Sequence, residues 1–399
     1  MSAYELYCRI FQKIVLLGQS LWNWKEPALV KGPGSVMELP PLIKSLRIKR
    51  VLLVTDSNLM KIGLAAPLLF RLAQAGVYCV VYCETSADPS TRNIEDALRL
   101  YRENRCEAII AFGGGSPMDC AKMAGLSFAY PRKELKKIRG VQPAMLRVPP
   151  PLFAVPTTAG TGSEVTLAAV VTDPGTHRKY TVLTPKLRPT YATLDPELTA
   201  GLPPHITAAT GMDALTHAVE AYIGRSNTKH TAAKALEAVG LIFRNLETAY
   251  QDGKNIKARE NMLQASYDVG VAFTRAYVGY AHGIAHALGG LYNTPHGLAN
   301  AVILPYVLDF YGASAYSRLA DLADAAGIAG EGAAQKARAF IQAIRDMNAR
   351  MGIPAAFDCI KEEDVPTIAC RALRECNPLY PVPKIMKQME CEEIVKKLT

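Results

Sequence analysis

The 399-residue sequence lacks internal repeats and low-complexity tracts, which argues against a solenoid, a long linker or a disordered arm. No apolar run is long enough to cross a membrane. Near the N-terminus Glu5, Arg9 and Lys13 interrupt the apolar residues, so we expect no secretory signal and no membrane partner. Residues 4–21 instead have the pattern of an amphipathic helix, which predicts a packing or oligomer contact.

Cysteine occurs nine times but never as a CxxC pair. Cys79 and Cys83 lie four residues apart in a strand-like stretch, which favours a shared sheet face over a metal clasp. An odd number of cysteines without a disulfide framework is typical of a reducing compartment. We therefore expect a cytoplasmic protein.

Charge of one sign is not concentrated anywhere, although the formal net charge is +9. The densest basic run, Arg132–Arg139, is short and typical of a solvated helix face or loop. We expect no nucleic-acid partner. The positive excess is compatible with an anionic dinucleotide but does not by itself select a function.

The two halves of the chain have different patterns. Short apolar runs at residues 51–54, 77–83 and 108–112 alternate with helical stretches, which predicts a parallel sheet covered by helices on both faces. The runs at 153–155 and 168–171 continue this sheet or add a hairpin. After the prolines near residue 203 the pattern is helical almost to the end. We predict an α/β domain of residues 1–205, an all-helical domain of residues 206–399, and a ligand site in the cleft between them.

Two glycine-rich loops follow apolar strands in the first half. Gly113-Gly114-Gly115-Ser116 precedes Pro117, which suggests a helix with Ser116 as its N-cap. A strand, glycine turn and helix start can direct backbone N–H groups at a phosphate, although an ordinary tight turn explains this loop equally well. The second loop, residues 156–164, carries several small hydroxyl side chains. Both loops lie at expected strand ends, so the pair favours a dinucleotide site.

Asp56 follows the first apolar strand. An Asp at this place accepts hydrogen bonds from a ribose 2′-hydroxyl and repels a 2′-phosphate, which favours NAD over NADP. A helix N-cap before Asn58 is an equally good explanation of the same residue.

Four of the seven histidines lie in two segments of the second half. Asp213 and His217 stand at i and i+4 on an apolar helix, and His282 and His286 repeat this spacing before His296 at a turn. Three imidazoles and one carboxylate suit Fe(II), Zn(II), Co(II) or Ni(II) better than Mg or Ca. Spacing alone leaves five candidates for about four ligand positions, so His282 and His286 both ligate or one of them serves the substrate.

Four segments together resemble the iron-containing (group III) alcohol dehydrogenase family, which has the dehydroquinate synthase-like fold. They are GGGSPMDCAK, VPTTAGTGSEVT, GMDALTHAVEAY and AHGIAHALGGLYNTPHGLANA, in that order, and the resemblance extends from about residue 25 to the C-terminus. It implies a metal held by Asp213, His217, His282 and His296, with His286 near substrate and nicotinamide instead of on the metal. It also implies cofactor contacts from Asp56, Gly114, Gly115, Ser116, Asp119, Thr157, Thr158, Thr161, Ser163, Val165 and Lys179. A homodimer or larger homo-oligomer is expected by the same analogy.

The function that follows is an NAD(P)-dependent interconversion of a primary alcohol or diol and its aldehyde. A divalent ion, Fe(II) by preference or Zn(II), would polarise the substrate oxygen while hydride passes to NAD, with NADP as the less favoured cofactor. His286 would pass the alcohol proton toward solvent. Glycerol dehydrogenase-like polyol oxidation is the nearest alternative, followed by a dehydroquinate synthase-like lyase and by a non-catalytic dinucleotide-binding protein.

Overall fold

The computed structural model describes residues 2–19, 22, 24–142, 145–173, 175 and 178–399. The chain forms two compact units, Asn23–Gly201 and a second unit made of Met1–Trp22 with Leu202–Thr399. The first is the expected α/β unit and the second is helical, so the fold class is confirmed. Among the described residues no helix combines the length and apolar character needed to span a membrane.

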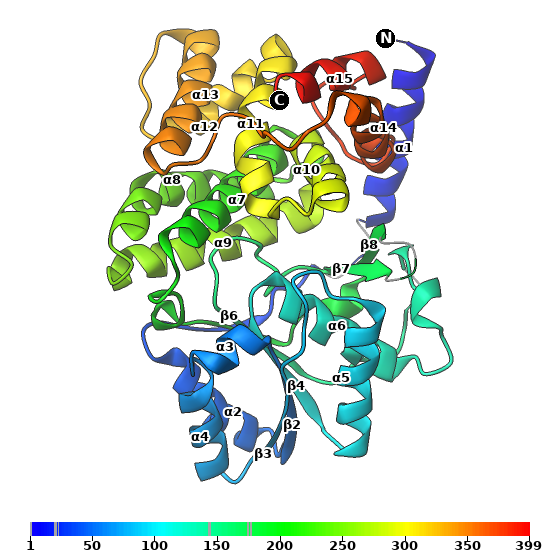
Figure 1. Cartoon of the computed structure of the whole chain (residues 1–399), viewed down its shortest axis with the longest axis vertical. Helices are drawn as coiled ribbons and strands as arrows, with labels where there is room; N and C mark the ends of the chain where they lie inside the picture. The colour runs from blue at the N-terminus through cyan, green and yellow to red at the C-terminus, as the bar shows by residue number, and fades with distance from the viewer. Residues whose placement is uncertain (1, 20–21, 23, 143–144, 174, 176–177) are drawn as a thin grey trace. The chain divides into compact units, whose positions relative to one another are not determined.

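The α/β unit is built on a six-stranded parallel sheet (Figure 1) with the order β1-β9-β6-β4-β2-β3. Its strands are β1 (Ala28–Lys31), β2 (Arg50–Val54), β3 (Tyr78–Tyr82), β4 (Ala108–Gly113), β6 (Leu152–Pro156) and β9 (Tyr191–Leu194). The same unit contains the helices α2 (Leu39–Ser45), α3 (Ser57–Lys61), α4 (Ala66–Gln74), α5 (Thr91–Glu103) and α6 (Gly115–Ala129).

Alternate residues of the central strands enter two separate cores. Leu52 and Ile109 pack with residues of α5 and α6 on one face, whereas Leu53 and Ile110 pack with residues of α2 and α4 on the other. Because both faces are buried, these strands are continuously apolar, as parallel strands in α/β proteins are. The apolar runs predicted from the sequence are therefore β2, β3, β4 and β6.

A second sheet of three strands has the order β5-β8-β7. It consists of β5 (Gly140–Val141), β7 (Ala168–Asp173) and β8 (Arg178–Leu183), and β7 pairs antiparallel with β8. Of the two alternatives for these runs, residues 168–171 form a hairpin with β8, whereas residues 153–155 continue the main sheet.

The helical unit contains α7 (Pro204–Ile223), α8 (Lys229–Gln251), α9 (Ile256–Ala276), α10 (Tyr280–Tyr292) and α11 (His296–Tyr311). It continues with α12 (Tyr316–Ala325), α13 (Gly332–Arg350), α14 (Val365–Cys376) and α15 (Gln388–Lys396). Gly224 is the C-cap of α7, and Asn293 ends α10 in the left-handed conformation. The turn signals near residues 224 and 294 therefore mark true helix ends.

The N-terminal helix α1 (Ala3–Gln19) belongs to the helical unit, which differs from the expected division at residue 205. Arg9 donates hydrogen bonds to the carbonyls of Val382 (2.7 Å) and Pro383 (3.0 Å). Gln12 donates to the carbonyls of Pro378 (3.0 Å) and Tyr380 (2.7 Å). These long-range bonds are the physical reason for the difference, because an amphipathic pattern predicts a packing face but not the element that it meets.

Candidate metal centre and dinucleotide-binding edge

The expected metal ligands converge around one carboxylate oxygen of the helical unit. Asp213 and His217 lie on α7 and His282 on α10, and ligand atoms of these three residues all lie within 4.8 Å of one another. The Nε2 atoms of His282 and His296 lie 3.9 Å and 3.5 Å from Asp213 Oδ1. His296 is the first residue of α11, so three helices contribute to this cluster.

The outer ring nitrogens of two histidines are held by hydrogen bonds. His217 Nδ1 donates to the Asp213 carbonyl oxygen (2.9 Å), and His282 Nδ1 donates to Glu220 Oε2 (2.7 Å). Such bonds fix the tautomer in which Nε2 carries the lone pair that a metal needs. His282 Nε2 is buried and has no hydrogen-bond partner among the described residues. An unpaired buried nitrogen is costly, and a bound cation beside Asp213 would satisfy it.

The pKa values of two histidines of the cluster are lowered, which favours the neutral form that ligates metals. Burial lowers the pKa of His217, and the neighbouring Asp213 only partly offsets that effect. Burial, followed by repulsion from the other imidazoles, holds the pKa of His282 well below its usual value. Neutral imidazoles with one carboxylate form a donor set suited to a divalent transition ion.

Glu220 was not singled out in the sequence, although it holds His282 in place. Its carboxylate also accepts hydrogen bonds from the backbone N–H groups of Gly279 and Ala281, both at 2.7 Å. Burial raises the pKa of Glu220 to about 7 even though these bonds lower it. Glu220 follows Asp213 by seven positions and His217 by three, so helical periodicity could have placed it on the same face of α7.

Asn300 is a second such residue, one turn after His296 on α11. Its Nδ2 donates to Asp213 Oδ1 (2.7 Å) and lies 3.1 Å from His296 Nε2. Gly297 allows α11 to approach α7 this closely, because a Cβ there would lie 2.4 Å from the Ala209 carbonyl oxygen. The glycine after the last histidine of the motif is thus a packing requirement.

His286 lies beside the cluster and has a different partner. Its Nδ1 donates to Glu375 Oε1 (2.6 Å), and its ring stacks on that of His296 with centroids 5.1 Å apart. The ring centroids of His282 and His286 are 6.2 Å apart. The compact group of three candidate ligands contains His282, whereas both His286 and His296 lie outside it.

The glycine loops of the α/β unit lie at one edge of the sheet. Asp56, Gly114 and Thr157 follow β2, β4 and β6, which are parallel neighbours, so their carboxyl ends share an edge. A Cβ at Gly115 would lie 3.1 Å from Thr161 Cγ2, and one at Gly114 would lie 3.4 Å from Thr158 Oγ1. The two loops therefore pack against each other at the edge where α/β proteins bind nucleotides.

The helix after the first loop begins earlier than the sequence predicted. Gly114, not Ser116, is the N-cap of α6, and Pro117 is the third helical residue. Proline is tolerated in a first turn because its missing N–H needs no intrahelical partner there. Gly114 provides no side-chain cap, and the Ser116 hydroxyl donates to the Ala87 carbonyl oxygen instead. An N-terminus without a side-chain cap is a suitable receptor for an anion.

Several predicted cofactor residues have partners within the chain. Asp56 Oδ1 caps α3 by accepting from the N–H groups of Asn58 (2.9 Å) and Leu59 (3.0 Å). Asp119 Oδ1 accepts from the Ser163 hydroxyl (2.9 Å). Lys179 lies on β8, outside the main sheet, and its Nζ is 2.7 Å from Asp88 Oδ1.

A buried lysine organises the second loop. Lys122 Nζ donates to the side-chain oxygens of Ser163 and Thr166, both at 2.8 Å, and to the Ala168 carbonyl oxygen at 3.0 Å. Burial lowers the pKa of Lys122 to about 8, although Asp119 and Glu164 favour its charged form. Asp119, Lys122 and Ser163 thus connect α6 to the second loop.

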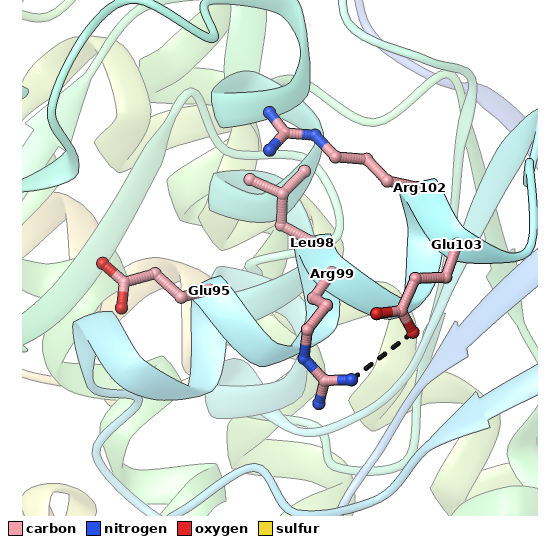
Figure 2. A pocket seen from close by; sticks show the side chains of 5 residues that line it. All are labelled: Glu95, Leu98, Arg99, Arg102 and Glu103. Atoms are coloured by element: carbon pink, nitrogen blue, oxygen red, sulfur yellow. Dashed lines mark hydrogen bonds and ion pairs between the residues drawn. The ribbon is translucent and has the colours of Figure 1, made fainter.

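Figure 2 shows a hollow along α5 that contains none of the predicted site residues. It is lined by Glu95, Leu98, Arg99, Arg102 and Glu103. Arg99 pairs with Glu103 at 3.4 Å, and both side chains are more than half exposed, at 57% and 55%. Such a hollow between solvated helix side chains does not have the character of a ligand site.

Comparison with known proteins gives two family matches. Residues 27–196 match the description "Iron-containing alcohol dehydrogenase", and residues 207–399 match "Fe-containing alcohol dehydrogenase family, C-terminal". The chain is 39% identical over 371 residues to the 1,3-propanediol dehydrogenase of Citrobacter freundii, covering 92% of this chain and 95% of that protein. It is 35% identical over 375 residues to the NAD-dependent methanol dehydrogenase of Bacillus methanolicus, covering 93% and 97%.

A solved structure has the same fold along nearly the whole chain. The crystal structure of a 1,3-propanediol oxidoreductase superposes with a TM-score of 0.91 at 36% identity, covering 95% of this chain and 100% of that one. The matches span both units, and the relatives oxidise or reduce small molecules at CH–OH groups. The two histidine-bearing segments, in which we expected the metal ligands, lie in the C-terminal match. The chain is therefore an oxidoreductase and a member of the iron-containing alcohol dehydrogenase family.

Proposed function

We propose that this protein interconverts a small primary alcohol or diol and its aldehyde, with NAD as the hydride carrier and a divalent metal ion at the Asp213 cluster. The observation that carries the proposal is the buried, unpaired Nε2 of His282, 3.9 Å from Asp213 Oδ1. The names of relatives support the substrate class, since they include a propanediol dehydrogenase and an NAD-dependent methanol dehydrogenase.

The proposed ligands are Asp213, His217, His282 and His296, with Fe(II) favoured and Zn(II) possible. When bound, the ion would polarise the substrate oxygen and make its proton more acidic. The chain's own contribution is orientation. Glu220 holds His282 and Asn300 holds Asp213, so these hydrogen bonds would orient both side chains toward a bound ion.

We propose that His286 accepts the proton of the substrate hydroxyl group. The reaction removes a proton from the substrate oxygen and a hydride from the adjacent carbon, and the nicotinamide accepts only the hydride. His286 stacks on the proposed ligand His296, so a base stands beside the position where the substrate oxygen would be held. The proton would move to His286 directly or through ribose hydroxyls.

For the dinucleotide we propose the edge formed by Asp56, the first glycine loop and Thr157 to Ser163. The uncapped N-terminus of α6 would receive the pyrophosphate. Asp56 uses Oδ1 for capping, which leaves Oδ2 for the adenosine ribose and favours NAD over NADP. Asp119, which bonds Ser163, would act by shaping the loop.

The proposal is tested by metal analysis of the purified protein and by NADH absorbance with primary alcohols, diols, glycerol and short aldehydes. We expect a transition ion at about one per chain and turnover of at least one alcohol–aldehyde pair. Bound metal and NAD without turnover on any alcohol would favour a dehydroquinate synthase-like lyase. Turnover of glycerol alone would favour polyol oxidation.

Two variants test the division of roles. His282→Ala should lose both metal and turnover, whereas His286→Ala should keep metal and lose rate. If His286→Ala loses metal as His282→Ala does, the ligand assignment is wrong. Full activity after dialysis against a chelator would refute the metal site itself.

We also propose a cytoplasmic homodimer or larger homo-oligomer. The nine cysteines are all unpaired in the structure, as in proteins of reducing compartments. Sedimentation velocity of the purified protein tests the assembly, and a monomer at all concentrations would refute it.

A further inference from the structure

Glu375 makes a short hydrogen bond with His286. It lies in the last turn of α14, and its Oε1 is 2.6 Å from His286 Nδ1. The same oxygen accepts a hydrogen bond from the Tyr380 hydroxyl at 2.9 Å. Both members of the pair are only partly exposed, His286 at 26% and Glu375 at 35% of the side chain.

The charge state of Glu375 decides the direction of this hydrogen bond. Burial alone would raise its pKa, but the neighbouring His286 and the hydrogen bonds from His286 and Tyr380 together hold the pKa of Glu375 below its usual value. The carboxyl is therefore ionised at neutral pH and can only accept. In the neutral imidazole, Nδ1 of His286 therefore carries the hydrogen and Nε2 carries the lone pair.

The backbone around Glu375 is built for close approach to α10. A Cβ on Gly283 would lie 2.3 Å from Cys376 Sγ, so only glycine at this place lets α14 pack so near. One turn of α10 separates Gly283 from His286, and Cys376 follows Glu375 directly. The packing of α10 on α14 therefore sets the distance between the imidazole and the carboxylate.

The segment after α14 is also held in place, by the N-terminal helix. Gln12 of α1 donates to the carbonyls of Pro378 and Tyr380, and Arg9 donates to those of Val382 and Pro383. These bonds fix the segment that carries the Tyr380 hydroxyl, and through it the carboxylate. A surface ion pair without such support would contribute little.

We propose that Glu375 is a positioning residue for the reaction, which keeps His286 in the Nδ1–H tautomer and stabilises the imidazolium that forms when Nε2 takes the substrate proton. The proposal rests on the role assigned to His286 above. In alcohol oxidation the O–H bond breaks and its proton goes to Nε2, while the C–H electron pair leaves as hydride to NAD⁺ and a C=O bond forms. Glu375 keeps its charge throughout, as the carboxylate of a Ser-His-Asp triad does.

A purely structural role predicts different behaviour. A tie between α10 and α14 would affect thermal stability and metal retention together, and would leave the turnover of the folded, metal-loaded protein unchanged. A positioning role affects kcat while metal content, NADH binding and the KM for alcohol stay close to those of the wild type. The two roles therefore separate in a single set of measurements.

The test uses Glu375→Gln in the metal-loaded protein, with Asp364→Asn as a matched control. Asp364 also accepts from a tyrosine hydroxyl, that of Tyr292, but it has no histidine partner in the described structure. We expect kcat of Glu375→Gln to fall about 10- to 100-fold, the usual cost of removing an outer partner of a site histidine, and that of Asp364→Asn to stay within about twofold. Glu375→Asp should recover part of the loss.

A second readout does not depend on turnover. In metal-free protein labelled with ¹⁵N at histidine, long-range ¹H–¹⁵N spectra should show His286 as the Nδ1–H tautomer, identified by its absence in His286→Gln. Glu375→Leu should abolish this preference. An unchanged His286 tautomer in Glu375→Leu would overturn the proposal.

The kinetic measurements also test the positioning role of Glu375. If kcat of Glu375→Gln stays within about twofold of wild type, or falls only in step with metal content, the positioning role is refuted. If His286→Ala keeps full turnover, the failure lies in the proposed role of His286 instead. Should Glu375→Gln fail to fold, Tyr380→Phe removes the second bond to the carboxylate, and an unchanged kcat there refutes the proposal.

Discussion

Replacing Glu220 with Gln should weaken the metal site without removing any proposed ligand. Glu220 receives three donors at 2.7 Å, the N–H groups of Gly279 and Ala281 and the Nδ1–H of His282. A carboxylate accepts on both oxygens, but an amide accepts on one side only. If the amide oxygen faces Gly279 and His282, the NH₂ group faces the Ala281 N–H; in the opposite orientation it faces Gly279 and His282, and His282 can relieve that clash only by moving its hydrogen to Nε2.

The size of the effect follows from these contacts. Glu220 is 3% exposed, so water cannot replace a lost partner, and one buried donor facing another costs about 1–3 kcal/mol of folding stability. The Nε2–H tautomer of His282 cannot ligate a metal. Loss of an outer partner of a ligand histidine typically costs about 10- to 100-fold in metal affinity, equivalent to about 1.4–2.8 kcal/mol.

The assay is metal retention during dialysis against graded chelator, together with urea unfolding of the metal-free protein. Glu237→Gln serves as the control, because Glu237 is an exposed glutamate of α8 whose side chain is 57% accessible. We expect the chelator concentration that removes half the metal to fall at least about tenfold in Glu220→Gln and to stay unchanged in the control. Equal metal retention in both proteins would refute the reasoning.

Two further predictions concern the α/β unit. The unfolded chain holds the proton of Lys122 up to its ordinary pKa of 10.5, whereas the folded protein releases it at a pKa of about 8. Between these values the unfolded state binds more protons, so the free energy of unfolding should rise with pH by up to about 3 kcal/mol from this residue. Urea unfolding of Lys122→Met should lack that rise, and an identical pH slope in both proteins would contradict it. Asp56→Gly should improve the kcat/KM for NADP relative to NAD, because the repulsive carboxylate is gone; an unchanged ratio of the two kcat/KM values would remove the cofactor argument.

The central strands that the sequence predicted, β2, β4 and β6, are buried on both faces. β2 and β4 are continuous apolar runs because their alternate residues enter two different cores. Two of the strands that it did not predict, β1 and β8, have no such pattern. β1 lies at the edge of the sheet with mostly exposed residues, and β8 begins with Arg178 and Lys179. Their pairing depends on neighbours that are distant in the sequence, so local patterns could not reveal it.

Site residues within one helix were predictable for a related reason. Asp213 and His217 share a face of α7 because helical spacing puts residues four apart on one side. The same rule extends to Glu220 on α7, and to Asn300, four residues after His296 on α11. Glu375 is different, since 89 residues separate it from His286. No periodicity connects two helices, and only the packing of α14 on α10 brings this pair together.

Glycines in the histidine-rich segments allow the close packing of the helices around the candidate site. A Cβ at Gly279 would lie 2.6 Å from Glu220 Oε1, one at Gly283 2.3 Å from Cys376 Sγ, and one at Gly297 2.4 Å from the Ala209 carbonyl oxygen. Each glycine therefore sits where a second helix or its side chain approaches a histidine-bearing segment. Within these motifs the histidines and the aspartate would supply the proposed metal chemistry, and the glycines set the distances between the helices that carry them. The glycines of such a motif indicate that another helix approaches closely, but they do not identify the residues on that helix. For this reason Glu375 could be found only in the structure.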